Sequence, residues 1–493
     1  MLRTLAVAGL LALIPASAEA FCGFYVSGAE ASLYNHATSV VLMRGGVRTV
    51  LSMQNNYEGP PEDFALVVPV PVVLREQDVK TLRRELFARV DALAAPRLVE
   101  YWEQDPCPGD GTIRDFTAVV QLSPTATRDA MGVRLAGTSG VTVEAEFAVG
   151  EYDIVILGAR DSSGLERWLR GNGYKLPPGA ASALRPYVQA GMKFFVAKVA
   201  IDRVTRDAGG RLTLSPLRFH YDSDTFSLPV RLGLLNTAGA QDLIVHVLAP
   251  GTRYQAANYP NVVVPTNLDV GEAALTQFGS FYAALFDRVG RQAPGAVVTE
   301  YAWAAGSCDP CPTDPLHEGE LAALGADVMP PGTVVDPGTI VLTRLHVRYG
   351  ADTLGEDLVF SAAAPLVGGR ETTDGRGQLE YGARVLAEGD NNFQARYAVR
   401  HPWVGPITCE RPMRGLWGGP PSGVMEARVA TELAFQPRDV PLSRFIPDSA
   451  SSGAVVLAAL PGEAGCASCS LGEGAGGLAG LGLVGLLRRR RRR

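Results

Sequence analysis

The stretch TSVVLMRGGVRTVLSM, residues 38–53, predicts two extended strands joined by a tight turn at Gly45 and Gly46. Apolar and branched residues fill both arms, and the paired glycines supply the backbone freedom that a short hairpin turn requires. The stretch FALVVPVPVV (64–73) follows and predicts another strand, which Pro69 and Pro71 are expected to interrupt. This part of the chain therefore predicts a β-sheet.

Helical periodicity is limited to a few segments between further strands. Apolar residues recur at helical spacing from Val79 to Leu93, over 164–170 and over 275–289. Strands are predicted at EYDIVIL (151–157), MKFFVAKVAI (192–201), QDLIVHVLA (241–249), NVVVP (261–265), TIVLTRLHVRY (339–349) and FQARYAVRH (393–401). Because helices and strands alternate irregularly, the expected fold class is strand-rich α+β.

Two distant stretches of the chain share a set of short motifs in the same order. The first contains VVP (67–69), LFARV (86–90), EYW (100–102), DPC (105–107) and YDSDTF (221–226). The second contains VVP (263–265), LFDRV (285–289), EYAW (300–303), DPC (309–311) and YGADTL (349–354). This self-similarity predicts an internal duplication with two related halves, 21–226 and 227–435. The first half carries an insertion of about 75 residues before its last motif.

The first twenty residues have the pattern of a secretory signal peptide. Arg3 precedes an apolar run over 5–14, and Ala18 and Ala20 form a small-residue cleavage site. Cleavage after Ala20 leaves Cys22 one residue inside the new terminus, so ordinary export is expected rather than lipoprotein processing. A buried N-terminal helix is the alternative interpretation.

The C-terminal end carries an apolar run followed by six arginines. Residues 475–487 are uncharged and would span about 20 Å as a helix, against a hydrocarbon core of about 30 Å. The arginines at 488–493 resist translocation, so they predict a short anchor whose end stays in the cytoplasm. Residues 436–465, rich in proline, serine and alanine, predict a tether ahead of a sorting tail at 466–493.

The charge balance argues against a nucleic-acid partner. The chain has a formal net charge of −6, which favours solubility and disfavours polyanion binding. The arginine run would suit nucleic acid by itself, but exported proteins seldom need such a site.

The cysteines predict an oxidised exterior domain. Cys22, Cys107, Cys308, Cys311 and Cys409 all precede the tail, and an odd number leaves one of them free or intermolecular. We expect two disulfides, one of them joining Cys409 to the Cys308 and Cys311 pair. The CDPC motif at 308–311 also permits thiol–disulfide exchange. Proline on both sides of Cys311, in a loop, favours a structural bond instead.

The tail resembles a MYXO-CTERM sorting signal in its cysteine motif, apolar helix and terminal arginine cluster. The resemblance implies removal of the helix and arginines by a membrane protease of the CAAX-processing type. It also implies that Cys466 carries the surface anchor.

Three N-terminal stretches carry a second resemblance. FCGFYVSGAEASLYNHATSVVLM (21–43), VLSMQNNYEGPPEDFALVVPVP (50–71) and PRLVEYWEQDPC (96–107) are similar to a bacterial family catalogued as a domain of unknown function, number twenty-three thirty. The likeness runs from Phe21 to about Trp417. It implies no activity, because the family has none established.

Motifs of known catalytic chemistry are missing from the sequence. There is no Gly-x-Ser-x-Gly elbow, no His-Glu-x-x-His pair and no phosphate loop ending in Gly-Lys-Ser or Gly-Lys-Thr. Asp222 and Asp224 do not complete a calcium loop, and His220 and His346 fit structural positions on strands. We therefore expect no catalytic residue, no cofactor and no metal.

The sequence favours an exported, surface-anchored, non-enzymatic envelope protein that presents loops for binding or structural interaction. Its expected partners are the export machinery, a tail-processing protease and the membrane, reached through the tail or a lipid on Cys466. The expected location is the cell surface or outer membrane, with the periplasm as the alternative. An envelope thiol–disulfide enzyme using Cys308 and Cys311 is the second hypothesis for the function, and a hydrolase without a recognisable motif is the third.

Overall fold

The hairpin predicted around Gly45 and Gly46 is present in the computed structural model of the chain. Strand β2 (Tyr34–Gly45) pairs antiparallel with β3 (Arg48–Glu58), with Gly45 opposite Arg48. Gly46 has a φ of 59°, a conformation that residues with a Cβ atom rarely adopt. The two-residue turn thus depends on this glycine.

The structure describes residues 24–26, 34–58, 65–107, 141–174, 176–206, 212–236, 239–372, 376–380, 382–420, 427–431, 436–438, 440–446 and 458–459. The predicted signal peptide with Ala18 and Ala20, as well as Cys22 and the sorting tail with Cys466, lie outside the described residues.

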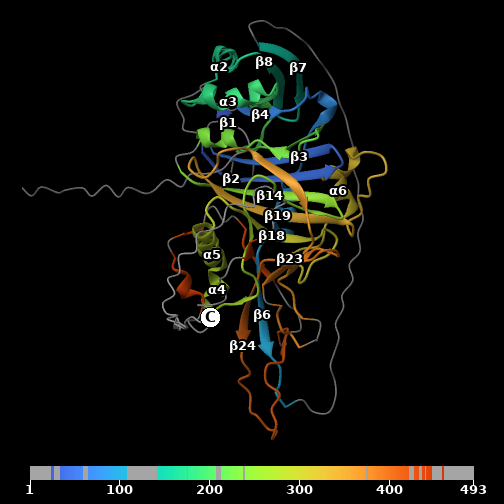
Figure 1. The fold of residues 1–493 in the computed structure, drawn as a ribbon, viewed down its shortest axis with the longest axis vertical. Coiled ribbons are helices and arrows are strands. Elements are labelled where there is room, and N and C mark those ends of the chain that lie inside the picture. Colours follow the sequence, from blue (N-terminus) through green and yellow to red (C-terminus); the bar gives the residue numbers. More distant parts are fainter. Residues whose placement is uncertain are drawn as a thin grey trace, which may run out of the picture. The chain divides into compact units, whose positions relative to one another are not determined.

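The β2–β3 hairpin lies within a 12-stranded sheet (Figure 1). Strand β2 runs parallel to β14 (Gln241–Pro250), and β14 pairs antiparallel with β19 (Ile340–Tyr349) along its whole length. The other strands of this sheet are β5 (Val79–Thr81), β12 (Leu217–Asp222), β16 (Asn261–Val263), β18 (Val297–Ala304), β21 (Leu366–Gly368), β22 (Ala383–Val385), β23 (Asn392–Gln394) and β27 (Ala458–Ala459). The contact between β2 and β14 joins the two predicted halves within one sheet.

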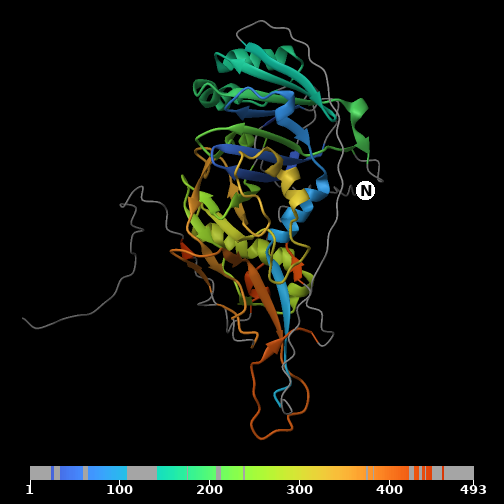
Figure 2. The same ribbon diagram turned by 90° about the vertical axis from the view of Figure 1, so that its right-hand side faces the viewer.

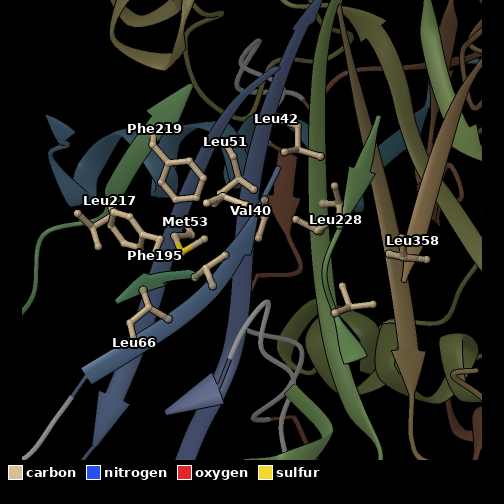
Figure 3. Close-up of a cluster of buried hydrophobic side chains, with 14 of the residues drawn as sticks. Val40, Leu42, Leu51, Met53, Leu66, Phe195, Leu217, Phe219, Leu228 and Leu358 are labelled. Carbon is tan, nitrogen blue, oxygen red and sulfur yellow. The ribbon is translucent and has the colours of Figure 1, made fainter. Parts of the chain in front are cut away.

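A five-stranded sheet packs against one face of the large sheet. It has the order β1 (Phe24–Val26), β4 (Ala65–Val70), β9 (Lys193–Val199), β8 (Tyr152–Ala159) and β7 (Val141–Val149). Leu66 and Phe195 from this sheet share a buried apolar cluster with Val40, Leu51 and Phe219 of the large sheet (Figure 3). Helices α2 (Ser162–Gly171) and α3 (Ala180–Gln189) bury their apolar residues in a separate cluster on the outer face of the five-stranded sheet.

Helices also cover the β18 region of the large sheet. Helix α5 (Phe278–Gln292) shares one cluster with Val298 and Ala302 of β18. Helix α1 (Arg84–Ala94) shares another cluster with Tyr301 and Trp303. Because successive strand residues point to opposite faces, the two helices cover opposite faces of this strand. Shorter helices are α4 (Ala273–Thr276) and α6 (Glu318–Leu324), the second of which is visible in Figure 2.

A second five-stranded sheet contains the strand that follows α1. Strand β6 (Arg97–Glu103) runs parallel to β24 (Arg396–His401) and also pairs with β25 (Trp417–Gly418) and β26 (Ala427–Val429), while β17 (Leu268–Asp269) pairs with the other edge of β24. Short strands complete the fold: β10 (Thr205–Arg206) with β11 (Leu212–Thr213), and β13 (Ser227–Leu228) with β20 (Leu358–Ala363) and β15 (Arg253–Ala256). The α+β, strand-rich class predicted from the sequence is confirmed.

Several element boundaries differ from the prediction. Val79 is not helical, because it pairs with Phe219 in strand β5 at the edge of the large sheet. Pro69 lies inside β4, beyond the residues 65–67 that pair with β1, so its missing N–H leaves no bond unmade on that side. The strand predicted over 393–401 is divided at Ala395, where the chain passes from β23 in one sheet to β24 in another.

Part of the predicted tether is packed instead. Phe445 and Ile446 are buried in the cluster that contains α5, and Arg438 pairs with Asp242 and Asp287. The apolar side chains and the arginine anchor residues 440–446 to the fold despite the surrounding prolines. The tether prediction for this part of 436–465 is therefore wrong.

The two predicted halves show the same order of a buried helix followed by a strand. Leu86, Phe87 and Val90 are buried on α1, as Leu285, Phe286 and Val289 are on α5. The strands differ in their neighbours, since β18 lies in the large sheet whereas β6 lies beside β24. Both helix motifs thus form core helices.

Replacement of either helix phenylalanine should open a cavity. We expect Phe87→Ala and Phe286→Ala each to lower the free energy of unfolding by about 3 to 5 kcal/mol, measured by denaturant titration. Exposed Val47→Ala is the control and should change it by less than about 0.5 kcal/mol. Destabilisation by only one of the two phenylalanine variants would contradict an equivalent core role.

Candidate functional site

Cys107 and Cys409 form a disulfide, with their Cα atoms 5.5 Å apart. Parallel pairing of β6 with β24 places Trp102 opposite His401, so the segments beyond these strands leave the sheet side by side. The pairing predicted for Cys409 with Cys308 or Cys311 is wrong. The sequence spacing could not reveal that β6 and β24, about 300 residues apart, are neighbours.

Cys308 and Cys311 are bonded to each other, with a Cα–Cα distance of 4.9 Å. They lie in the loop after β18, and the next helix, α6, begins only at Glu318. Cys311 is exposed and Cys308 is partly buried. The helix start that normally lowers the pKa of a redox-active cysteine is therefore not adjacent to this pair.

The loop from Pro402 to Arg414 presents apolar side chains to solvent. Val404 is 98% exposed, Ile407 45% and Met413 51%, and Figures 1 and 2 show the chain projecting beyond β24 in this region. Large apolar side chains grouped on one exposed loop mark an interaction site more often than isolated ones do.

One carboxylate fixes both ends of this loop. Glu103 accepts hydrogen bonds from the backbone N–H of Gly415 and of Trp403, each at 3.0 Å, and from Arg414 Nη1 at 2.9 Å. The two backbone N–H groups, together with the Arg414 charge, lower the pKa of Glu103. Glu103 therefore ties the two ends of the loop together, and the Cys107–Cys409 bond ties its middle to the segment after β6, while the side chains of Val404, Ile407 and Met413 stay exposed. Glu103 was not singled out by the sequence, since its ligands come from about 300 residues away.

A separate cavity of about 200 Å³ lies where two of the repeated motifs meet. Pro69 follows the first VVP valines, and Tyr221, Ser223 and Thr225 come from YDSDTF; all four line the cavity. Asp357 completes one wall, where its Oδ1 accepts hydrogen bonds from Tyr187 and from the N–H groups of Val230 and Arg231. The cavity is a small hollow lined by four prolines and five hydroxyl-bearing residues beside one carboxylate.

His346 lies at the centre of a buried charge cluster under α5. Its Nδ1 is 2.7 Å from Glu300 Oε1 and its Nε2 is 3.0 Å from Asp242 Oδ1. The Phe286 ring stacks on the imidazole with 3.7 Å between centroids. The prediction that His346 is a satisfied structural residue is confirmed, because both ring nitrogens have partners.

The surrounding arginines neutralise the carboxylates of this cluster. Arg344 contacts Glu300 and Asp91, while Arg348 and Arg438 both contact Asp242. Burial alone would lower the pKa of His346, but Glu300 and Asp242 outweigh it and raise that pKa. The pKa of Glu300 falls to about 2: burial opposes the fall, and His346 and Arg344 drive it. The cluster is an ionic cross-link between β14, β18 and β19 in which both imidazole nitrogens of His346 are engaged.

The described residues contain no group of three or more His, Cys, Asp or Glu side chains placed to hold a metal ion. Within the same part of the chain, no helix combines the length and apolar character that a membrane span requires.

Fold and site together define a strand-rich α+β protein with a disulfide-held apolar loop and buried ionic cross-links. The chain belongs to the family described as an uncharacterized protein conserved in bacteria, DUF2330, which matches residues 15–361. The match ends before the exposed loop and short of the extent to Trp417 expected from the sequence. No curated protein and no solved structure matches the chain.

The two disulfides should contribute unequally to stability. Cys107–Cys409 closes a segment of 302 residues, whereas Cys308–Cys311 spans three. Because loop closure restricts the unfolded chain more for longer loops, replacing the first pair by serines should cost about 2 to 5 kcal/mol and the second pair less. Denaturant unfolding of both double variants measures this, and an equal or reversed order would contradict it.

The protonated state of His346 should make stability depend on pH. Its raised folded pKa means that the stabilisation is fully present below the unfolded pKa, about 6.5, and is lost as pH rises through the folded value. The difference in unfolding free energy between wild type and His346→Gln should therefore shrink with rising pH. It is measured by denaturant titration from pH 5 to 9 at constant ionic strength.

His246 provides a control of opposite sign for this pH dependence. Burial and the neighbouring Arg344 lower its pKa to about 3, so its neutral form stabilises the fold above about pH 6.5. The difference for His246→Gln should grow from pH 5 to about pH 6.5 and then level off. Equal slopes for the two variants would disprove the assigned charge states.

Proposed function

We propose that the protein is an exported, surface-anchored, non-enzymatic envelope protein that presents the 402–414 loop to a partner protein. The exposure of Val404, Ile407 and Met413 on a loop fixed at both ends and at its middle carries this proposal. A pre-organised loop loses little conformational entropy on binding, so its exposed apolar side chains can contribute burial energy efficiently. The partner surface that fits is apolar, because the exposed side chains of the loop are apolar.

Export and anchoring come from the two ends of the chain. The signal peptide at 1–20 directs export, and the MYXO-CTERM-type tail at 466–493 directs processing and attachment through Cys466. What remains of the predicted tether, after the sheet residues Ala458 and Ala459, links the packed domain to that tail. The two disulfides of the described domain suit an oxidising compartment outside the cytoplasm, with the cell surface or outer membrane as the destination.

The two halves of the domain descend from one duplicated unit in this proposal. The repeated motifs form a core helix followed by a strand in each half. The additional residues of the first half include β7, β8, α2, α3 and β9. That insertion supplies three strands of the smaller sheet and the helices that cover it.

A thiol–disulfide enzyme is the second candidate, favoured by the exposed position of Cys311 within a bond spanning three residues. The test is treatment of the protein with a mild dithiol reductant. In an exchange enzyme, this treatment frees both thiols, and the reduced protein then reduces a disulfide substrate. A structural bond gives no turnover.

Anchoring depends on Cys466 if the tail is processed as proposed. Cys466→Ala should release the domain into the medium or leave the arginine tail attached, because the attachment residue is missing. Intact mass of the membrane-extracted and released protein measures this, and Cys469→Ala is the matched control. Unchanged processing and surface retention of Cys466→Ala would exclude this role.

The loop itself is tested with a photo-crosslinking amino acid at position 404 in living cells. Position 334 is the matched control, since Val334 is also an exposed valine, at 59%, but lies outside the loop. We expect a discrete protein adduct from 404 that Ile407→Asp weakens, and none from 334. Adducts of equal pattern from both positions would refute the loop as the binding site, and adducts to lipid alone would refute a protein partner.

A further inference from the structure

Two fully buried arginines lie side by side behind the Cys308–Cys311 loop. Arg97 and Arg396 are the first residues of β6 and β24, and they are direct partners in the parallel register. Both are 0% exposed. Two positive charges buried away from solvent destabilise the folded state unless anions lie beside them.

The two Nη groups of Arg97 are hydrogen-bonded within the protein, whereas its Nε has no acceptor among the described residues. Its Nη1 donates to the Pro310 carbonyl at 2.8 Å and its Nη2 to the Leu93 carbonyl at 2.6 Å. Its guanidinium also lies over the Tyr301 ring, 5.4 Å from the centroid. Burial, and then repulsion from Arg396, lower the pKa of Arg97 despite a favourable contribution from Tyr301. A negative charge placed beside these two buried arginines is therefore electrostatically favourable.

Arg396 has an unoccupied end. Its Nε donates to Asn267 Oδ1 at 3.0 Å, but within the described part of the chain neither Nη1 nor Nη2 has a hydrogen-bond acceptor. The Asp309 carboxylate is 3.7 Å from Nη1, which makes an ion pair too long for a hydrogen bond. The two Nη groups form the end of the guanidinium fork that binds two oxygens of a carboxylate or phosphate.

A buried acceptor completes this arrangement. Gln394 Nε2 donates to the carbonyls of Asp309 and Gly369, while its Oε1 has no donor among the described residues. Gln394 and Arg396 thus both contact Asp309 and both keep unused hydrogen-bonding capacity. An oxyanion that also carries an O–H donor satisfies the two at once.

We propose that Arg396, with Arg97 behind it and Gln394 beside it, forms a binding site for a phosphate group under the Cys308–Cys311 loop. Asp309, whose side chain is 48% exposed, is the internal carboxylate that the incoming anion displaces toward solvent. A second carboxylate, Glu371, already accepts a hydrogen bond from the Tyr101 hydroxyl at 2.8 Å. Hydrogen phosphate offers both the paired oxygens for Arg396 and the hydroxyl for Gln394, whereas sulfate offers only the first.

The test is calorimetric titration of the purified mature protein with inorganic phosphate at pH 7 and constant chloride. We expect one saturable site per chain, with sulfate binding more weakly. Arg396→Gln should weaken phosphate binding at least tenfold. Arg400→Gln is the matched control on the same strand, because Arg400 is paired with Asp269 and stacked on Trp417, and it should bind phosphate as wild type does.

Asp309→Ala keeps the proposal testable even when the buried variant does not fold. Removal of the competing carboxylate should tighten phosphate binding severalfold, because nothing then needs to be displaced. Absence of saturable phosphate binding, unchanged affinity in Asp309→Ala, or equal loss in Arg400→Gln would each overturn the site. Preferential binding of acetate that depends on Arg396 would overturn the phosphate assignment.

Discussion

The parallel pairing of β2 with β14 is the contact on which the rest of the fold depends. Parallel neighbours cannot be joined by a hairpin, so a long stretch of chain separates β3 from β14. Along it the chain returns to the large sheet for β5 and β12, and it builds four strands of the smaller sheet, α1 and β6. Because β14 and β19 are buried on nearly all sides, both faces of the large sheet need a cover, and the smaller sheet and the helices provide it.

Covering both faces of those strands also buries charged residues. Burial of His346 and Arg344 on β19 without partners would strongly destabilise the fold. Glu300 on β18 and Asp242 on β14 lie within hydrogen-bonding distance of them. The ionic partners come from adjacent strands and therefore fix which strands are neighbours. Arg396 is different, since its outer nitrogens have no acceptor in the described chain. The charges on β19 are thus neutralised within the fold, whereas Arg396 keeps nitrogen donors available for the proposed ligand.

The 402–414 loop, which follows β24, is held in place without being packed into a hydrophobic core. Glu103 restrains the two ends of the loop and the Cys107–Cys409 bond restrains its middle, while the side chains of Val404, Ile407 and Met413 remain in water. Apolar side chains in water lower stability little and raise the free energy available for binding. The loop lies beyond the residues matched by the family, so its role is argued from this chain's own geometry.

Local chemistry along the chain was sufficient to predict the strand-rich α+β class, the glycine hairpin, the core faces of α1 and α5, and the structural role of His346. These features depend on periodicity and turn residues within short windows. Tertiary structure alone decided the Cys107–Cys409 pairing, the burial of Phe445, the Glu103 anchor and the Arg97–Arg396 pair. Each of those features joins segments that are far apart in sequence. The strand register that brings them together is set by the burial of both faces of the whole sheet, and a short window of sequence does not contain that information.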